Sequence, residues 1–174
     1  MPIERSDVGA WIVKCNAVKV WNYFDKMKRL QVPYGVKYAT DWSFGNTYRN
    51  NLIRQGDLVL LWVTSANGTA IHEVGVATGQ IRVDVIDEDD LIDEALRGVA
   101  QPFIEYDGVR LKRPVSRDHF LREPVLAKSE PIAAPKMTNP TFLTHEELAV
   151  LVKYFRPPDL RAAGWPSHVI SSRA

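Results

Sequence analysis

The sequence of 174 residues is informative first through what it lacks. It has one cysteine, Cys15, which excludes an intrachain disulfide and any metal site built from several cysteines. Its longest apolar run, residues 58–63, has six residues and is far shorter than the roughly 20 that a membrane-spanning helix needs. The N-terminal residues MPIERSDVGAW contain no apolar stretch of the kind found in a signal peptide, so we expect a cytoplasmic protein.

A large net charge is also absent. The formal charge of +1 by itself argues against a nucleic-acid partner, but residues 1–60 carry +4, residues 61–105 carry −7 and residues 106–174 carry +4. Residues 84–94 hold seven carboxylates, which we interpret as a solvated loop leading into a helix over 91–97, with metal or partner binding as the alternative. The near-neutral total therefore conceals two basic segments.

The sequence motifs that mark common enzyme sites are missing. It contains no GxSxG, GxxxxGK[ST], GxGxxG or HExxH pattern. The histidines are scattered, without a second ligand at metal spacing: His72, His119, His145 and His168. We therefore expect no enzymatic activity, no cofactor and no metal, while acid–base catalysis by Asp41 or Glu73 without a recognisable motif stays open.

Hydrophobic periodicity and turn residues predict short strands with few helices. We expect a strand over 9–15, a helix over 17–30, irregular structure over 33–48, a hairpin of 57–65 with 71–85 around Asn67-Gly68, and short strands over 102–109 and 125–128. Thr144 and Glu147 predict a capping box for a helix that ends near Tyr154. This order favours an α+β domain over 1–155, a small, partly closed β-barrel with helices at its ends, followed by a proline-containing tail over 156–174 that can pack on it.

Aromatic and amide residues form an ordered series beside these elements. The series consists of Ile12-Val13-Lys14, Trp42, Arg49-Asn50-Asn51-Leu52, Gly56-Asp57-Leu58-Val59 and Gly75-Val76-Ala77, and a later segment, 136–144, precedes the last helix. In order and spacing it resembles the EVE domain, a member of the PUA-like superfamily, over roughly residues 10–85. It departs from the usual EVE pattern at Cys15-Asn16 and in a shorter interval from Trp42 to Arg49. Lys14-Cys15-Asn16 and Trp42-Ser43 are similar to segments of the related YTH readers of methylated adenine.

The resemblance implies a PUA-like fold and a binding module, not an enzyme, that recognises a modified, in particular methylated, base of DNA or RNA in an aromatic-lined pocket. A base that leaves its stack loses a few kcal/mol of stacking and pairing free energy. Stacking on tryptophan returns about 1–3 kcal/mol, and a buried methyl group adds about 0.8 kcal/mol. An asparagine amide can both donate to and accept from the edge of the base.

Nine residues are our candidates for this site. The base pocket is expected to contain Asn16, Trp42, Ser43, Trp62, Met137 and Pro140, and phosphate contact or support of the pocket is expected from Lys14, Arg49 and Asn50. Each residue has a structural alternative. Trp42 and Trp62 could belong to the core, Asn16 could close a turn, and Ser43 could cap a loop. Arg49 could form an ordinary salt bridge, and Asn50 a loop hydrogen bond.

A second class of function remains open beside the reader. The chain could be a protein-interaction or accessory module of a defence or toxin–antitoxin system that keeps a PUA-like fold without a nucleotide ligand. An open cavity with aromatic walls would favour the reader. A pocket filled by the protein's own side chains would favour the interaction module.

Overall fold

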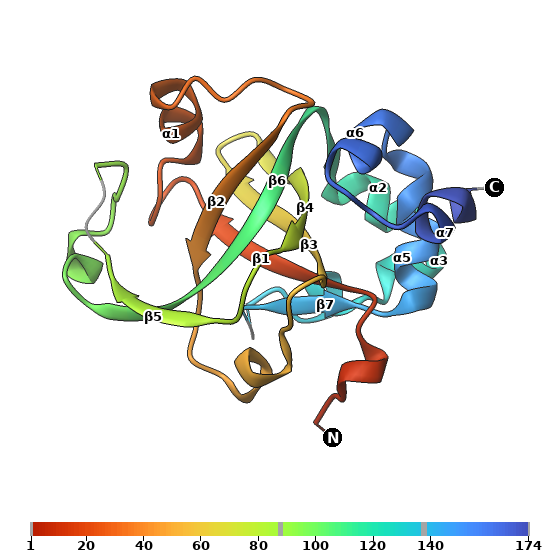
Figure 1. Cartoon of the computed structure of the whole chain (residues 1–174), viewed down its shortest axis with the longest axis horizontal. Coiled ribbons are helices and arrows are strands. Elements are labelled where there is room, and N and C mark those ends of the chain that lie inside the picture. The colour runs from red at the N-terminus through yellow and green to blue at the C-terminus, as the bar shows by residue number, and fades with distance from the viewer. Residues whose placement is uncertain (1, 87–88, 137–138, 174) are drawn as a thin grey trace.

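A seven-stranded mixed sheet forms the centre of the protein (Figure 1). The structure is a computed structural model and describes residues 2–86, 89–136 and 139–173. The strand order is β2-β6-β4-β3-β1-β7, with β5 also paired to β6; β1 and β3 run parallel and the other pairs are antiparallel. The strands are β1 (Ala10–Asn16), β2 (Lys37–Ser43), β3 (Leu58–Ser65), β4 (Gly68–Ala77), β5 (Arg82–Val85), β6 (Ala100–Ser116) and β7 (Thr141–Leu143).

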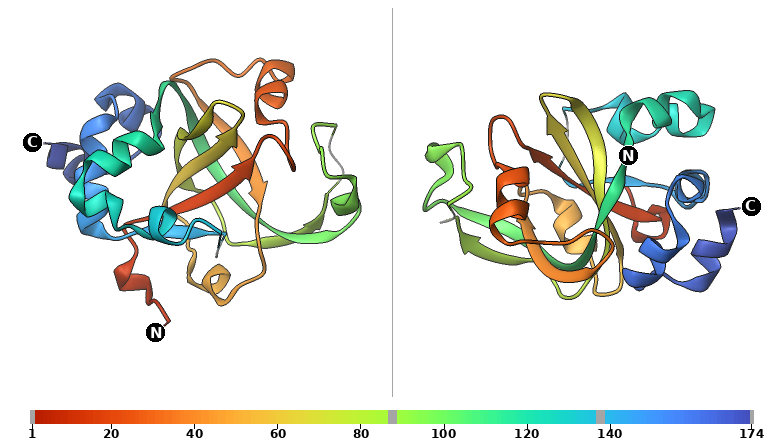
Figure 2. Two further views of the ribbon diagram at one scale, coloured as in Figure 1. Left: turned by 180° about the vertical axis from the view of Figure 1, so that it is seen from behind. Right: turned by 90° about the horizontal axis from the view of Figure 1, so that it is seen from above.

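Short helices cover the two faces of the sheet unequally. Helices α2, α3, α5, α6 and α7 gather on one side, whereas α1 lies beside β2 on the other (Figures 1 and 2). The helices are α1 (Tyr23–Arg29), α2 (Arg117–Arg122), α3 (Pro124–Ala127), α4 (Glu130–Ala133), α5 (His145–Leu151), α6 (Pro157–Ala162) and α7 (Ser167–Ile170). The fold is therefore α+β, as expected from the sequence, but β2 and β7 form the two ends of the sheet, which is open and not closed into a barrel.

The sheet separates two hydrophobic cores. Successive residues of a strand point to opposite faces, so in β1 Ile12 packs towards the C-terminal helices and Trp11 towards the side of α1. In β3, Leu60 and Leu61 divide in the same way. Because β1 and β3 are buried on both faces, their sequences are nearly continuous apolar runs.

A bulge in β4 changes which residues face which core. Residues Ile71 and Glu73 pair with consecutive residues of β3, Trp62 and Leu61, so His72 is the extra residue of the bulge. Strict alternation would place Ile71 and Glu73 on the same face. The bulge leaves Ile71 in the core under the C-terminal helices and turns Glu73 towards Tyr23 on the side of α1.

Several expectations about single elements are confirmed. The hairpin of β3 and β4 forms around the expected turn, although only Gly68 adopts a positive φ, of 109°. Thr144 and Glu147 make the expected capping box, with Thr144 Oγ1 accepting from Glu147 N and Glu147 Oε2 accepting from Thr144 N.

Other expectations were wrong. Residues 37–43 form β2 instead of an irregular segment, because β6 supplies a pairing partner along the whole length of β2. Residues 124–127 form helix α3 instead of a strand, with Pro124 in its first turn, where proline is tolerated. The helix expected over 17–30 is confined to α1, and the helix expected over 91–97 is a single 3-10 turn, Glu94–Leu96.

The expected tail packs on the domain through residues 160–165. Leu160, Ala163 and Trp165 belong to the core under the C-terminal helices, and Trp165 Nε1 donates to the carbonyl oxygen of Gly75 at 2.9 Å. These residues therefore contribute to one and the same folded unit as the sheet.

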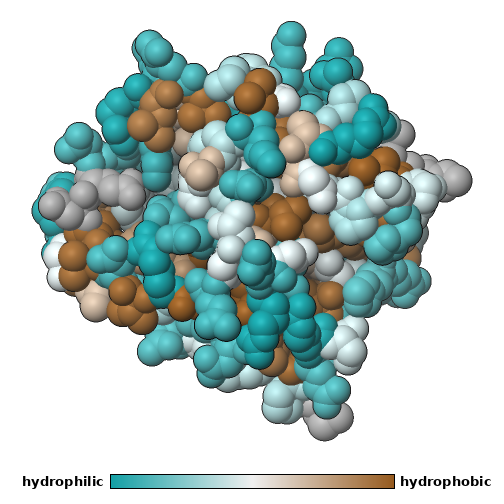
Figure 3. All heavy atoms as spheres, viewed as in Figure 1, coloured by the Kyte–Doolittle hydropathy of each residue, from teal (hydrophilic) through white to brown (hydrophobic). Residues whose placement is uncertain are grey.

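The surface is mixed in polarity. In the view of Figure 3, hydrophilic residues cover most of the face, and brown patches lie over α1 and beside β5. Exposed apolar side chains in these regions include Leu30, Val83 and Val85. No helix in the described part of the chain is long and apolar enough to cross a membrane.

Candidate functional site

Two tryptophans, a tyrosine and a lysine meet on the α1 side of the sheet, and we call these four residues the Trp42 cluster. The ring centroids of Trp21 and Trp42 are 5.9 Å apart with an interplanar angle of 89°, and Tyr23 lies 5.9 Å from Trp42. Trp42 comes from β2 and Tyr23 from the first turn of α1, while Trp21 precedes the N-cap of that helix. The cluster thus unites the segment after β1 with the edge strand β2.

The side chain of Lys26 lies over the two tryptophan rings of the Trp42 cluster. Its Nζ lies 4.6 Å from the ring centroid of Trp42 and 5.9 Å from that of Trp21, within the range of cation–π attraction. Tyr23, Lys26 and Met27 form the buried face of α1, so the helix directs the lysine inward. Trp42 and Trp21 are 2% and 4% exposed, and the space over their rings is filled by the protein's own side chain.

The indole N–H of Trp42 is a buried donor without an acceptor. Nε1 of Trp42 has no hydrogen-bond partner among the described residues. A buried donor of this kind costs about 1–3 kcal/mol compared with a hydrated one, and native structures contain few of them. A ligand that placed an acceptor beside Nε1 would recover this free energy.

A buried carboxyl group lies under the same region. Glu73 is fully buried and accepts hydrogen bonds from the hydroxyls of Tyr23 at 2.7 Å, Tyr38 at 2.6 Å and Tyr106 at 3.0 Å. Burial raises the pKa of Glu73, against the opposing effect of the three tyrosine hydroxyls and of the positive charge on Lys26. We call Glu73 and its three tyrosines the Glu73 cluster.

A surface hollow leads to both clusters. It has a volume of about 420 Å³, in the size range of small-molecule sites. Its walls include Lys26, Tyr38, Thr40 and Tyr106, and Asp41 and Glu105 contribute carboxylates at its rim. Arg82 binds both of these carboxylates, Asp41 at 2.5 Å and Glu105 at 2.7 Å. We call this space the outer hollow.

The structure places Asn16 and Ser43 near the Trp42 cluster, in different roles. Asn16 Oδ1 accepts from the backbone N–H groups of Val18 and Lys19, both at 3.0 Å, so its side chain closes the turn after β1. The carbonyl oxygen of Asn16 also accepts from Trp21 N. Ser43 is half-buried at the end of β2 and pairs with Phe103.

Four other predicted residues meet at a separate junction. Asn139 joins the backbone N–H and carbonyl of Lys14, and the Lys14 ammonium donates to the carbonyl of Pro135. Arg49 forms an ion pair with Glu130 at 2.5 Å and donates to the carbonyl of Pro140. Asn50 donates to the carbonyl of Gly45. Here Arg49 holds the 48–52 turn against the 130–141 segment, and Met137 lies outside the described residues.

Trp62 does not belong to the same site as Trp42. It packs in the core under the C-terminal helices, 5.0 Å from Phe120 between ring centroids, on the opposite face of the sheet. A base that stacks on Trp42 therefore cannot also contact Trp62. The second aromatic ring beside Trp42 is Trp21, which is not among our nine candidates.

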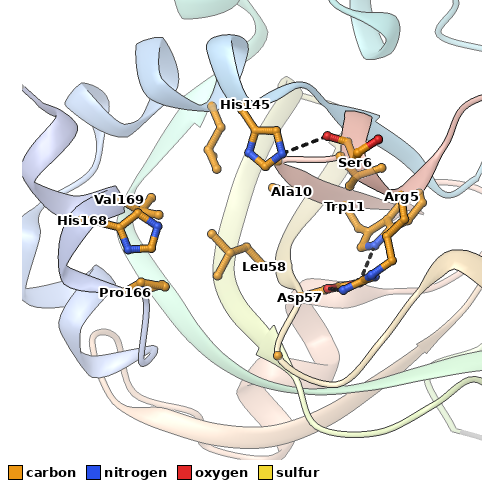
Figure 4. A pocket seen from close by; sticks show the side chains of 14 residues that line it. Arg5, Ser6, Ala10, Trp11, Asp57, Leu58, His145, Pro166, His168 and Val169 are labelled. Atoms are coloured by element: carbon orange, nitrogen blue, oxygen red, sulfur yellow. Dashed lines mark hydrogen bonds and ion pairs between the residues drawn. The ribbon is translucent and has the colours of Figure 1, made fainter.

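A second hollow, of about 410 Å³, lies at the other end of β1 (Figure 4). Its polar wall is occupied by internal contacts: Arg5 pairs with Asp57 at 2.6 Å, and the indole N–H of Trp11 donates to Asp57 at 3.0 Å. His145 contacts the carbonyl oxygen of Ser6 at 3.2 Å. These bonds fasten the N-terminal segment to the sheet, so we regard the Trp42 cluster as the better candidate site.

The four types of metal-ligating side chain do not converge anywhere in residues 2–86, 89–136 and 139–173. No group of three or more His, Cys, Asp or Glu side chains in these ranges could hold a metal ion. Burial and the neighbouring Arg110 lower the pKa of His72 to about 4, so this imidazole is neutral at pH 7. The side chains of the Trp42 cluster offer a ligand stacking, cation–π contact and hydrogen bonding.

Comparisons with known proteins support the fold. No protein family and no curated protein matches the chain. A crystal structure from Pseudomonas syringae matches with 14% identity and a TM-score of 0.58, covering 83% of this chain and 98% of that one. A structure from Agrobacterium tumefaciens matches with 19% identity and a TM-score of 0.52, covering 91% and 94%.

The DUF55 domain of human thymocyte nuclear protein 1 is similar as well. It is 11% identical, with a TM-score of 0.53, and the match covers 79% of this chain and 93% of that domain. At such identities the likeness concerns the fold alone. The chain has a PUA-like fold.

Proposed function

We propose that this protein is an EVE-type binding module, not an enzyme, that recognises one modified base of DNA or RNA, in particular a methylated one, at the Trp42 cluster. The observation that carries the proposal is the unpartnered indole N–H of Trp42 beneath a lysine side chain. Tightly packed apolar groups would leave no room for a ligand. A lysine has a flexible four-carbon stem and can withdraw into solvent.

The energies allow a base to replace Lys26. Withdrawing the ammonium from the two rings costs about 0.5–2 kcal/mol. A base stacked on Trp42 contributes about 1–3 kcal/mol. Because the indole N–H points in the plane of its ring, the acceptor for Nε1 has to come from another part of the nucleotide than the stacked base. Lys26 also lines the outer hollow, so its withdrawal would connect the cluster with solvent there.

Single-stranded oligonucleotides with and without a central methylated base test this function by titration. Trp42→Phe keeps a ring but removes the N–H, and we expect it to weaken binding of the methylated strand about five- to tenfold. Trp62→Phe makes the same change on the opposite face and should leave the affinity unchanged. Equal weak binding of every strand by all three proteins would refute the proposal.

Salt dependence gives a second readout. The affinity of a protein that neutralises many phosphates falls steeply with salt. With a net charge of +1, this chain should make few phosphate contacts and rely on the base, so the slope should be shallow. A steep slope would mean that the backbone, and not the base, dominates binding.

One observation favours the alternative of an interaction module without a nucleotide ligand. The rings of Trp21 and Trp42 are almost fully buried, and Lys26 fills the space over them. Lys26→Ala should open this space and tighten base binding if the protein is a reader. If the opened variant binds no methylated or unmodified strand, the interaction module is the better description.

A further inference from the structure

The Trp42 cluster already holds a cation. The ammonium of Lys26 is 4.6 Å from the ring centroid of Trp42 and 5.9 Å from that of Trp21. Lys26 is only 7% exposed, although lysine is rarely buried to this extent. The negative faces of two indoles thus surround a group of positive charge, an arrangement that proteins also use to bind methylated ammonium ligands.

A buried acid near the cluster favours this positive charge. Glu73 is fully buried, its hydrogen-bond donors are three neutral tyrosine hydroxyls, and the charge of Lys26 lowers its pKa. A neutral ligand that displaced Lys26 would remove this charge from the surroundings of Glu73. A ligand with its own positive charge would replace it.

The rim of the outer hollow carries negative charge, as the faces of the two indoles do. Asp41 and Glu105 present carboxylates there, bridged by Arg82. The single charge of Arg82 offsets one of these two negative charges, so the hollow beside Lys26 keeps a net preference for cations. The hollow and the cluster therefore both favour positive charge.

We infer that the Trp42 cluster selects a base whose methylation gives it a positive charge, such as 1-methyladenine or 3-methylcytosine, over a base whose methylation leaves it neutral. The inference rests on the proposed function, because it specifies which base occupies the site of Lys26. The incoming charged ring takes the place of the ammonium on Trp42 and Trp21. The ring of a neutral methylated base can stack there but does not replace the charge of Lys26 near Glu73.

Isomeric ligands test this inference directly. A short single-stranded oligoribonucleotide with one central 1-methyladenosine, which is positively charged at pH 7, is compared with the same strand carrying neutral N6-methyladenosine. Binding is followed by tryptophan fluorescence. We expect the charged isomer to bind about tenfold more tightly, in keeping with a cation–π contact in a desolvated site. A strand with 3-methylcytidine compared with 5-methylcytidine should give the same order.

Two lysine variants on α1 provide the matched controls. Lys26→Met removes the resident charge while keeping an unbranched side chain, and it should tighten binding of the charged isomer about fivefold. Lys28→Met makes the same change at an exposed position of the same helix and should change both affinities less than about twofold.

The outcomes separate this inference from the proposed function. Equal binding of the two isomers, or tighter binding of the neutral one, overturns the selectivity for charge and leaves the base reader intact. Failure of every methylated strand to bind overturns both. Binding of a trimethyllysine peptide without binding of any strand would likewise overturn both, because the cluster would then take a cation that is not a base.

Discussion

Replacing Glu73 by glutamine perturbs a fully buried polar arrangement. Oε2 of Glu73 accepts from Tyr23 and Tyr38, and Oε1 accepts from Tyr106. Glutamine offers one carbonyl oxygen in place of two carboxylate oxygens. If that oxygen keeps the bonds to Tyr23 and Tyr38, the amide N–H₂ faces Tyr106, whose hydroxyl proton is left without an acceptor.

The expected loss of stability follows from this geometry. One buried hydroxyl donor without a partner costs about 1–3 kcal/mol. A domain of this size has a free energy of unfolding of about 5–15 kcal/mol, so Glu73→Gln should fold but unfold at a clearly lower urea concentration.

The loss should also depend on pH. Burial raises the pKa of Glu73 above its ordinary value of 4.5, so above that pH the native state retains a proton that the unfolded chain has released. Native protein then binds more protons than unfolded protein, and the stability contributed by Glu73 falls as pH rises through the window from 4.5 to the raised pKa. Glutamine has no proton to release. The difference in the free energy of unfolding between wild type and Glu73→Gln should therefore be largest below pH 4.5 and become smaller as pH rises.

Urea unfolding followed by circular dichroism, from about pH 4 to about pH 8, measures both effects. Glu146→Gln is the control, because it makes the same change on the exposed surface of α5 and should cost less than about 1 kcal/mol. The reasoning is refuted if Glu73→Gln costs no more than the control, or if its deficit grows as pH rises.

Three further predictions concern other parts of the structure. Arg49→Met leaves Glu130 without its ion-pair partner and should cost about 2–3 kcal/mol in urea unfolding; an unchanged midpoint would show that the pair is not structural. Cys15 is buried, which raises the pKa of its thiol to about 12, so its reaction with an aromatic disulfide reagent should be slow in the native protein and fast in urea. Trp165→Ala removes a core side chain and its bond to a strand carbonyl, and should cost about 3–5 kcal/mol in the same assay. A small effect there would contradict the assignment of the C-terminal residues to the domain.

The sequence predicted those elements whose signals are local. The hairpin depends on the turn residue Gly68. The start of α5 depends on Thr144 and Glu147, which are three residues apart and bond each other's backbone N–H groups. Strand β2 was missed because its polar pattern, Lys37–Ser43, becomes a strand only through pairing with residues of β6 that lie 60 to 72 positions later in the chain.

The candidate site was predicted only in part. Trp42 was a candidate through the resemblance, but its neighbour Trp21 was not among the candidates. The inward position of Lys26 carries no signal in the sequence, because lysines on helices are ordinarily solvated. Glu73 reaches the site through the bulge at His72, which reverses the alternation that sequence reasoning assumes.

The place of β1 between β3 and β7 has a consequence for synthesis of the chain. The ribosome produces β1 and β3 within the first 65 residues, but β7, which covers the other edge of β1, ends at Leu143. Until then, an apolar strand edge of the nascent protein stays unpaired and can capture a neighbouring chain. Variants that weaken β7 should therefore lower the yield of soluble protein more than they lower the stability of the protein that has folded.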